Sequence, residues 1–398
     1  MAYLIDKMGN RVGSATYKHI LPFSEGLAPF QDEHTSMWGI LRLDGSVAIA
    51  ASYQECKGFS EGLAAVKFQD KWGYIDSSNQ VVIPFIYDWA RHFNEGYASV
   101  LKIIEGENKW GIIDKKGVPI TKFKYKFVVG FSEGIAGVCE ENRFTCVDST
   151  GKELFEPAYK MILPYENGYA LAIEPGNKYS LLDRIGNKVL SGFDGLSDLK
   201  EGVIGACKDG LWGFVDISGK TIIPFIYHEV VNGFENGFCC VKLDNNRFGF
   251  IDRNEQTVVP FVLKEVIISN RTKNKLLQKT LAVVALDIRK GFVNLENKVV
   301  EGYMPPPLRP KYDVKKFVNS YGIIRPEDGE VVLPFNYSDV RPYNDGLAKV
   351  SVGTKTGYVD GEGKWVIPLG NYGIASSFCE GRAIADMEYS HRETTHKI

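Results

Sequence analysis

Apolar residues occur along the chain in short runs separated by turn-forming residues, a pattern that favours β-strands over helices. In the stretch from Phe59 to His92, one apolar run covers Leu63 to Phe68 and a second covers Trp72 to Ile75. Ser77-Ser78-Asn79 then predicts a tight turn, because Asn tolerates positive φ. These elements predict an antiparallel meander.

The second half of this stretch predicts two further elements. Val81-Val82-Ile83 reads as a third strand. We expect Pro84 to end it, because proline cannot donate to a sheet ladder. Phe85 to Asp88 then predicts a short fourth element before Phe93.

The alternation of side chains assigns the residues of the second run to two faces. Trp72, Tyr74 and Asp76 lie on one face of the expected strand, and Gly73 and Ile75 lie on the other. A glycine at this place allows another backbone or a ring to approach closely. Each unit therefore exposes apolar surface that only a neighbouring unit can cover.

The same six-residue motif recurs along the chain. Residues 71–76 read KWGYID, residues 109–114 read KWGIID and residues 211–216 read LWGFVD. The position of Asp76 recurs, with some degenerate copies, at Asp6, Asp44, Asp114, Asp148, Asp183, Asp216, Asp252, Asn294, Arg325 and Asp360. A second landmark keeps the same phase, at Glu25-Gly26, Glu61-Gly62, Glu95-Gly96, Glu133-Gly134, Asn167-Gly168, Glu201-Gly202, Asn236-Gly237, Asp345-Gly346 and Glu380-Gly381. Two markers in one phase predict an all-β protein of about eleven tandem meander repeats of roughly 35 residues, forming a single array over residues 1–398.

These motifs resemble the bacterial WG-repeat family. The resemblance rests on KWGYID with its sister copies, on FSEGLAAV at residues 59–66 and on VVIPFIYD at residues 81–88. Phe144-Thr145 and Tyr179-Ser180 depart from the Trp-Gly pair, and the pattern blurs from 262 to 321. The resemblance implies a bacterial or bacteria-associated repeat protein. It implies no activity common to the members of the family, and it assigns no catalytic residues to this chain.

The two ends of the chain carry complementary halves of a unit. The chain starts at a second strand, Leu4 to Asp6, and finishes with a first strand, Glu380 to Ala385. These halves fit either a closed ring resembling a β-propeller or an open, curved or superhelical array with half-unit caps. We expect the open array, because stacked repeats need contacts only with their neighbours.

Composition adds few constraints on function. The net charge of −2 gives no overall attraction to nucleic acid or to an anionic membrane, and no apolar run is long enough to span a bilayer. No secretory signal is visible at the start, so we expect a cytoplasmic protein, or an extracytoplasmic one if a signal peptide has been removed. The seven cysteines are scattered over several repeat positions, which predicts small packed side chains in a reducing compartment.

The candidate chemistry in the sequence is better explained by structure than by catalysis. The repeated aspartates, such as Asp76 and Asp114, precede turns, where the carboxylate can accept backbone N–H groups. The histidines fall at different repeat positions, and the common nucleophile, metal and nucleotide motifs are missing. We therefore expect no cofactor and no metal site. The missing motifs favour a non-enzymatic protein but leave open an enzyme that uses dispersed residues.

One irregular segment stands out by charge. Residues 262–321 form a degenerate repeat with a proline-containing insertion, and from 264 to 316 they hold twelve basic residues against five acidic ones. The candidate partner-binding residues in it are Arg271, Lys273, Lys275, Lys279, Arg289 and Lys290. Such a loop could bind an acidic surface of a protein partner; a solvated loop is the equal alternative.

The sequence leaves three functions open. The first is a non-enzymatic scaffold that binds a protein or other macromolecule, because repeat proteins vary their loops on a fixed frame. The second is a carbohydrate-active hydrolase or glycan-binding module that uses carboxylates and aromatic residues such as Trp89 and Tyr125 in a central cleft. The third is a binding module of the cell surface or envelope.

Overall fold

The computed structural model describes residues 1–244, 246–267, 282–286, 291–293, 298–301, 320–370 and 375–386. These residues form strands and turns, and none of them lies in a helix that could cross a membrane. All strand pairs in the described part are antiparallel, as the meander pattern predicts.

The strands group into sheets that follow the chain order. The first sheet of the N-terminal part contains β3 (His19–Ile20), β4 (Leu27–Gln31), β5 (Trp38–Arg42) and β6 (Val47–Tyr53). The second contains β7 (Glu55–Ser60), β8 (Leu63–Phe68), β9 (Lys71–Asp76) and β10 (Val81–Tyr87). The third contains β11 (Trp89–Ala90), β12 (Tyr97–Ile104) and β13 (Glu107–Asp114). The fourth sheet contains β14 (Phe127–Ser132), β15 (Ile135–Glu140) and β16 (Arg143–Asp148). The fifth contains β17 (Met161–Ile162), β18 (Ala170–Ile173), β19 (Tyr179–Leu182) and β20 (Lys188–Phe193). The sixth contains β21 (Gly195–Lys200), β22 (Val203–Lys208), β23 (Leu211–Asp216) and β24 (Thr221–Tyr227).

The C-terminal part contains the remaining sheets. A seven-stranded sheet joins β25 (Glu229–Glu235), β26 (Phe238–Lys242), β27 (Phe248–Asp252), β28 (Thr257–Ile267), β29 (Ala282–Leu286), β32 (Ser320–Ile324) and β33 (Val331–Tyr337). A separate hairpin pairs β30 (Gly291–Val293) with β31 (Val299–Glu301), and a four-stranded sheet holds β34 (Asp339–Val340), β35 (Ala348–Val352), β36 (Lys355–Val359) and β37 (Trp365–Gly370). The last sheet joins both ends of the chain, in the order β2 (Arg11–Tyr17), β1 (Ala2–Asp6) and β38 (Arg382–Asp386).

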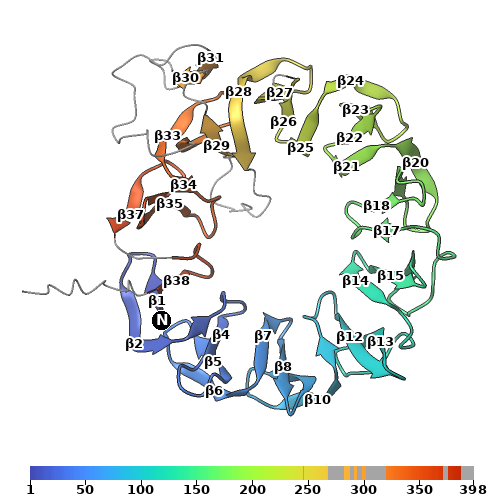
Figure 1. The fold of residues 1–398 in the computed structure, drawn as a ribbon, viewed down its shortest axis with the longest axis vertical. Coiled ribbons are helices and arrows are strands. Elements are labelled where there is room, and N and C mark those ends of the chain that lie inside the picture. Colours follow the sequence, from blue (N-terminus) through green and yellow to red (C-terminus); the bar gives the residue numbers. More distant parts are fainter. Residues whose placement is uncertain are drawn as a thin grey trace, which may run out of the picture.

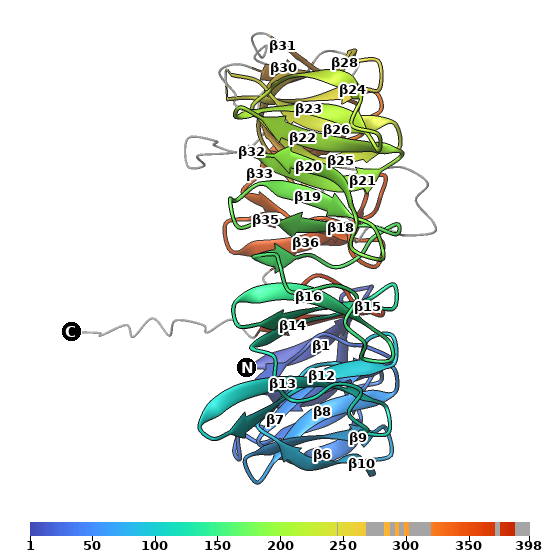
Figure 2. The ribbon, with the colours of Figure 1, turned by 90° about the vertical axis from the view of Figure 1, so that its right-hand side faces the viewer.

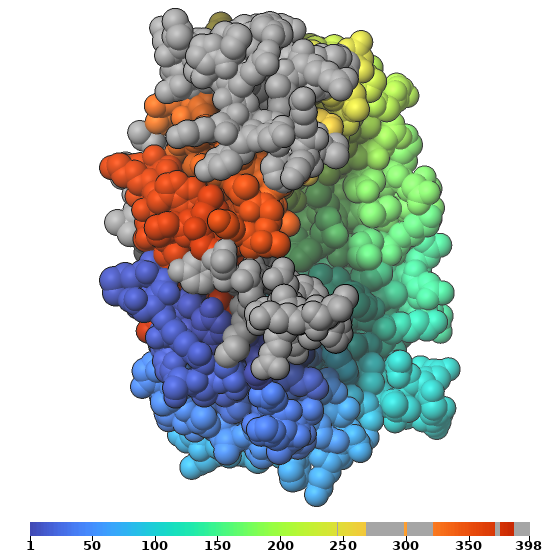
Figure 3. Space-filling view, turned by 60° about the vertical axis from the view of Figure 1, so that its left-hand side comes forward, coloured from blue at the N-terminus to red at the C-terminus, as the bar shows by residue number. Residues whose placement is uncertain are grey.

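The sheets succeed one another around a ring (Figure 1). Seen from the side, the ring is a single layer of sheets (Figure 2), and in the space-filling view the blue N-terminal part adjoins the red C-terminal part (Figure 3). Strand β1 pairs with β38 in register from Ala2 opposite Asp386 to Asp6 opposite Arg382. The expected open array is therefore wrong, because the two half-units form one sheet and leave no free end.

The predicted number of about eleven repeats stays a prediction. The repeat positions near 294 fall between described segments, and the described residues assign seven strands to one continuous sheet. The predicted single array over residues 1–398 stays a prediction for the same reason.

The strands of the second sheet differ from the sequence prediction in two places. A strand precedes the first predicted one, and the expected third strand at 81–83 and most of the expected fourth element at 85–88 form one strand. In the second sheet, β7 precedes the predicted strands, and Pro84 lies inside β10 rather than at its end. The register shifts between Ile83 and Tyr87, so the strand bulges around the proline. Because β10 is the outermost strand of its sheet, the missing N–H of Pro84 costs no ladder hydrogen bond.

The apolar core lies between consecutive sheets. Trp72 and Tyr74 on one face of β9 pack with Val100 and Ile113 of the next sheet. Ile75 on the other face packs with Ile40 of the preceding sheet. The sequence prediction that each unit needs its neighbours is confirmed.

The glycine of the repeated motif is required by a close backbone contact. A Cβ on Gly73 would lie 2.6 Å from the carbonyl oxygen of Ile83 and 2.7 Å from the ring of Phe85. A Cβ on Gly213 would lie 2.7 Å from the equivalent carbonyl oxygen, of Ile223, and a Cβ on Gly357 would lie 2.7 Å from that of Ile367. In these three units the path of the outermost strand therefore leaves no room for a side chain at the glycine position.

A carboxylate at the turn of one sheet binds the turn of the next sheet around the ring. Glu25 accepts hydrogen bonds from the backbone N–H groups of Glu61 and Gly62. The same contact joins Glu61 to Gly96, Glu95 to Glu133 and Gly134, Glu133 to Asn167 and Gly168, Glu201 to Gly237, Asp345 to Gly381, and Glu380 to Glu25 and Gly26. The Glu-Gly pairs thus lie in turns, and their side chains connect the sheets.

Candidate functional site

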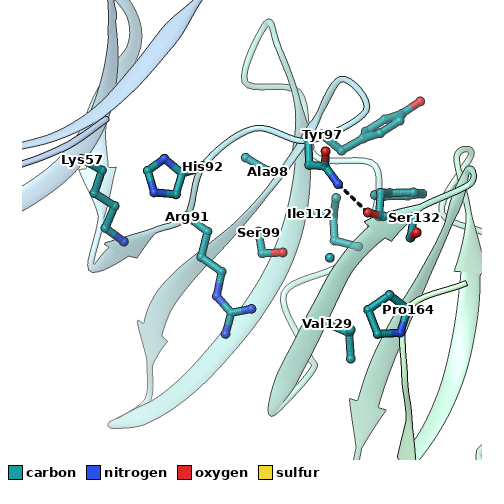
Figure 4. A pocket seen from close by; sticks show the side chains of 13 residues that line it. Lys57, Arg91, His92, Tyr97, Ala98, Ser99, Ile112, Val129, Ser132 and Pro164 are labelled. Atoms are coloured by element: carbon teal, nitrogen blue, oxygen red, sulfur yellow. Dashed lines mark hydrogen bonds between the residues drawn. The ribbon is translucent and has the colours of Figure 1, made fainter. Parts of the chain in front are cut away.

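A cavity of about 400 Å³ lies between three consecutive sheets of the N-terminal half (Figure 4). Its wall comes from β7 in the first of these sheets, from β12, β13 and the residues that join β11 to β12 in the next, and from β14 in the last. A loop that follows β17 completes it. The residues that line it are Lys57, Arg91, His92, Asn94, Tyr97, Ala98, Ser99, Ile112, Val129, Gly130, Phe131, Ser132 and Pro164. The volume lies within the range of small-molecule sites in proteins.

Two basic residues occupy the same repeat position at this cavity. Lys57 lies two residues before the buried Phe59, and Arg91 lies two residues before the buried Phe93. In the next sheet the equivalent position is Val129. The repeat frame therefore places two cations side by side and an apolar side chain beyond them.

Lys57 is held between two indole rings. Its Nζ lies 4.8 Å from the ring centre of Trp72 in its own sheet and 4.3 Å from that of Trp89 in the next sheet. It also donates a hydrogen bond of 2.5 Å to the backbone carbonyl of Ala90. The lysine therefore connects two sheets through cation–π contacts and one hydrogen bond.

Arg91 repeats this arrangement one sheet further on. Its guanidinium lies 4.8 Å from the ring centres of both Trp110 and Phe127. Its Nη1 donates a 2.7 Å hydrogen bond to the carbonyl of Val128, the equivalent of Ala90. The tryptophan of the repeated motif therefore forms one wall of a cation site at two successive joints.

Polar side chains fix the other parts of the cavity wall. Asn94 donates a 2.7 Å hydrogen bond to the carbonyl of Phe131, and the Nδ1 atom of His92 lies 3.1 Å from the carbonyl oxygen of Gly58. Ser132 donates to the carbonyl of Tyr165 at 2.6 Å. Each of these bonds joins one sheet to its neighbour, so the cavity is formed by the ring rather than by a single repeat.

The cavity is electropositive. No Asp or Glu lines it, and neither Lys57 nor Arg91 is within ion-pair distance of a carboxylate in the described part of the chain. Burial, together with the nearby positive charge of Arg91 and against the opposing charge of Glu55, lowers the pKa of Lys57 to about 8. Burial also lowers the pKa of Arg91. Both effects show that the two charges are poorly compensated by protein groups.

The described residues include only some of the candidates from the sequence. Arg271, Lys273, Lys275, Lys279, Arg289 and Lys290 are all outside the described residues. Of the two aromatic residues proposed for a central cleft, Trp89 is 40% exposed beside the cavity, whereas Tyr125 is 2% exposed and its hydroxyl donates to Glu153. The structure therefore does not bring Trp89 and Tyr125 together as an open platform.

The repeated aspartates serve the turns, as predicted. Asp76 accepts hydrogen bonds from the backbone N–H groups of Ser78 and Gln80 at 2.9 Å, and Asp114 binds Lys116 and Val118 in the same way. Within the described segments, no group of three or more His, Cys, Asp or Glu side chains is arranged to hold a metal. The seven cysteines are free, and six of them are buried.

The sequence analysis missed the cavity and its two cations. A signal was present, because Lys57 and Arg91 stand at one repeat position in successive units, next to the aromatic residues Trp72, Trp89 and Trp110. The same repeat position holds Leu21, Ser197, Asn232, Arg341 or Ser376 in other units, so the frame does not require a basic residue there. The signal is that two successive units both have one.

Comparison with known proteins identifies related repeats. The WG containing repeat matches seven stretches of the chain, at residues 38–72, 72–102, 110–144, 144–179, 212–246, 321–355 and 357–388. A sequence comparison with curated proteins found no match.

Solved structures resemble the fold at low sequence identity. The crystal structure of the eukaryotic initiation factor is 9% identical with a TM-score of 0.50, over 87% of this chain and 97% of that chain. BamB from Moraxella catarrhalis has a TM-score of 0.35 at 10% identity, over 85% of this chain and 98% of that one, and Sqt1 from Saccharomyces cerevisiae has 0.34 at 12%, over 67% and 89%. The first similarity bears on the fold alone.

Proposed function

The chain belongs to the WG containing repeat family, and from this membership and the ring geometry we propose that it is a non-enzymatic scaffold that binds a protein or other macromolecular partner. In this proposal the closed ring, similar to a β-propeller, is the rigid frame. Segments that depart from the regular repeat provide the contacts.

One projecting hairpin carries the proposal. Strands β12 and β13 each have eight residues and pair as far as Ile104 opposite Glu107. The equivalent strands β8 and β9 have six residues each and end at Phe68 opposite Lys71. The extra length places Ile103 and Ile104 in solvent, with 55% and 40% of their surface exposed.

Exposed isoleucines at a hairpin tip contribute little to the fold. Successive side chains in a strand point to opposite faces. Ile103 and Ile104 therefore present an apolar side chain on each face of the tip. Adjacent exposed apolar residues on a rigid element are typical of a site that becomes buried against a partner. The repeat frame holds this tip in place without using it for packing.

The alternative of a carbohydrate-active hydrolase or glycan-binding module has less support. Most glycosidases need two carboxyl groups that flank the substrate, and the described cavity is lined by none. The proposed partner site on the basic segment of residues 262–321 remains a second prediction for the same scaffold function.

The test uses the full chain as bait with a chemical crosslinker, followed by mass spectrometry of the crosslinked peptides. We expect one macromolecule to be crosslinked to the hairpin of β12 and β13 in stoichiometric amount. The double substitution Ile103→Ser and Ile104→Ser should reduce its recovery at least tenfold. Ile185→Ser, which changes a 68% exposed isoleucine in a different turn, is the matched control and should leave recovery unchanged.

Two results would contradict the proposal. Recovery unaffected by the double substitution would exclude the hairpin as the contact. The absence of any stoichiometric partner, with the ring folded, would exclude the scaffold itself.

A further inference from the structure

We propose that the cavity beside Lys57 and Arg91 binds a small organic anion, with its acidic group near the two cations and its apolar part against Val129 and Pro164. This site lies at the other end of the β12–β13 hairpin from the tip at Ile103 and Ile104, since β12 contributes Tyr97 to Ser99 to its wall. The inference does not depend on the scaffold function. The shared ligand chemistry is a carboxylate or phosphate group attached to an apolar body.

The first support is the charge of the wall. Lys57 and Arg91 come from neighbouring sheets and face one cavity, with His92 beside them (Figure 4). Burial and the charge of Lys57 lower the pKa of His92, so this side chain adds a polar ring rather than a third charge. The nearest compensating charge on Lys57 comes from Glu55, which already forms an ion pair with Lys67 at 3.0 Å. An anion in the cavity would neutralise charges for which the protein supplies no lining carboxylate.

The second support is the number of donors that remain. Lys57 has three N–H donors, and its Nζ makes one hydrogen bond to a protein acceptor in the described segments. Arg91 has five N–H donors, of which Nη1 makes one such bond, to Val128. The rings on either side hold both cations in place, so the remaining donors are pre-organised for an oxyanion.

The third support is the apolar side of the wall. Val129 stands at the repeat position that holds Lys57 and Arg91 in the two preceding sheets, and Pro164 closes the cavity beyond it. Ile112 and Phe131 add further apolar surface. A cavity with cations at one end and apolar side chains at the other fits an amphipathic anion better than a hydrated inorganic ion.

The test measures binding of three probes of similar shape to the full chain by isothermal titration calorimetry at low salt. Phenyl phosphate and phenylacetate carry the anion, and phenylacetamide is the neutral counterpart of phenylacetate. We expect at least one anionic probe to bind at least tenfold more tightly than phenylacetamide. Preference for phenyl phosphate would assign a phosphate ligand, and preference for phenylacetate would assign a carboxylate.

Substitutions at Lys57 locate the binding to this cavity. Lys57→Met keeps the aliphatic stem and removes the charge. We expect this substitution to weaken binding of the anionic probe at least tenfold. Lys57→Arg keeps the charge and should retain binding within about threefold. If Lys57→Met does not fold, the wild-type comparison of phenylacetate with phenylacetamide still decides the proposal.

Three outcomes would overturn the inference. These are equal binding of charged and neutral probes, no binding of any probe at millimolar concentration, and unchanged affinity in folded Lys57→Met.

Discussion

The carboxylate of Glu380 accepts a hydrogen bond of 2.8 Å from the backbone N–H of Glu25, although the two residues are 355 positions apart. Its other oxygen accepts the N–H of Gly26 at 2.7 Å. Glu95 makes the same pair of bonds to Glu133 and Gly134, at 2.8 and 2.7 Å. The joint that closes the ring is therefore built like a joint between consecutive repeats.

Removing this closing carboxylate should loosen the sheet that holds both chain ends. Glu380→Ala deletes two hydrogen bonds from a charged acceptor, and we expect a loss of about 1–3 kcal/mol in the free energy of unfolding. Amide hydrogen exchange should become faster in β1 and β38. Denaturant unfolding and exchange mass spectrometry measure the two effects.

Glu95→Ala is the matched control for Glu380→Ala. It removes the same pair of bonds between two sheets that are adjacent in sequence. We expect a similar loss of stability, but with faster exchange around β14 and with β1 unaffected. Unchanged exchange in β1 of the Glu380→Ala variant would show that strand pairing alone closes the ring.

The glycine of the repeated motif should tolerate no side chain. Gly73→Ala places a Cβ within 2.6 Å of the Ile83 carbonyl oxygen, so the outermost strand must move. We expect a loss of about 1–3 kcal/mol, as for other overpacked sites. Gly58→Ala is the control, because its Cβ would meet no atom closer than 3.9 Å, and its effect should stay within about 0.5 kcal/mol. Equal melting temperatures for the two variants would contradict this account.

The local elements followed from the sequence because their causes are local. The motif strand, the turn at Asp76 and the need for Gly73 all depend on residues a few positions apart. Ring closure depends on β1 meeting β38 across the whole chain. The complementary half-units indicated that such a pairing was possible, but no local pattern decides between an open and a closed array.

The contacts between turns could have been anticipated from one anomaly. Glu61 has φ of 53° and Glu95 has φ of 52°, in the left-handed region that Gly, Asn and Asp normally occupy. Turn chemistry alone would favour Asn or Asp there. A glutamate that recurs at such a position indicates that its longer side chain makes a contact outside its own turn.

The cavity required the assembled ring. Lys57 and Arg91 belong to different sheets, and nothing in either unit alone shows that their side chains face one space. The basic segment of residues 262–321 had the stronger charge signal in the sequence, but a run of charge does not show what surrounds it.

The pH dependence of stability should report the burial of Lys57. The pKa of Lys57 is lowered to about 8 in the folded chain, whereas an unfolded lysine keeps its higher ordinary value. Between these two values the unfolded state binds more protons, so this residue makes stability rise with pH from about 8 upwards. Its unfavourable contribution is fully present below that range.

This dependence can be isolated by comparison with Lys57→Met. The difference in the free energy of unfolding between wild type and variant should move in favour of the wild type from pH 7.5 to pH 9.5. Urea unfolding at the two pH values measures it. A difference that stays constant or moves the other way would contradict the lowered pKa.

The cysteines should differ in reactivity toward iodoacetamide. Burial raises the pKa of both Cys56 and Cys146 to about 12, so almost no reactive thiolate is present at pH 8. Cys379 is only partly buried. We expect Cys379 to be alkylated first in the native chain and Cys56 and Cys146 only after unfolding, as followed by peptide mass spectrometry. Simultaneous labelling of all three would indicate that the native packing around Cys56 and Cys146 opens readily.

Cys379 makes at the ring closure the same hydrogen bond that Ser60 makes between two sheets that are consecutive in sequence. Its Sγ donates to the carbonyl of Phe23 at 3.0 Å, as Ser60 donates to the carbonyl of Phe93 at 2.7 Å. Alkylation of Cys379 would remove this bond at the ring closure. The modified chain should therefore melt at a lower temperature than the unmodified chain.

Because β1 pairs with β38, the chain ends could be moved to any loop between two sheets without loss of a strand pair. A circular permutant that links the present ends by a flexible peptide, and opens the chain between Tyr87 and Trp89 instead, retains every strand pair of the native ring. The order in which the repeats are synthesised would change, while the folded contacts would not. A ring of this kind can thus present its free ends at whichever joint a fusion partner or a surface attachment requires.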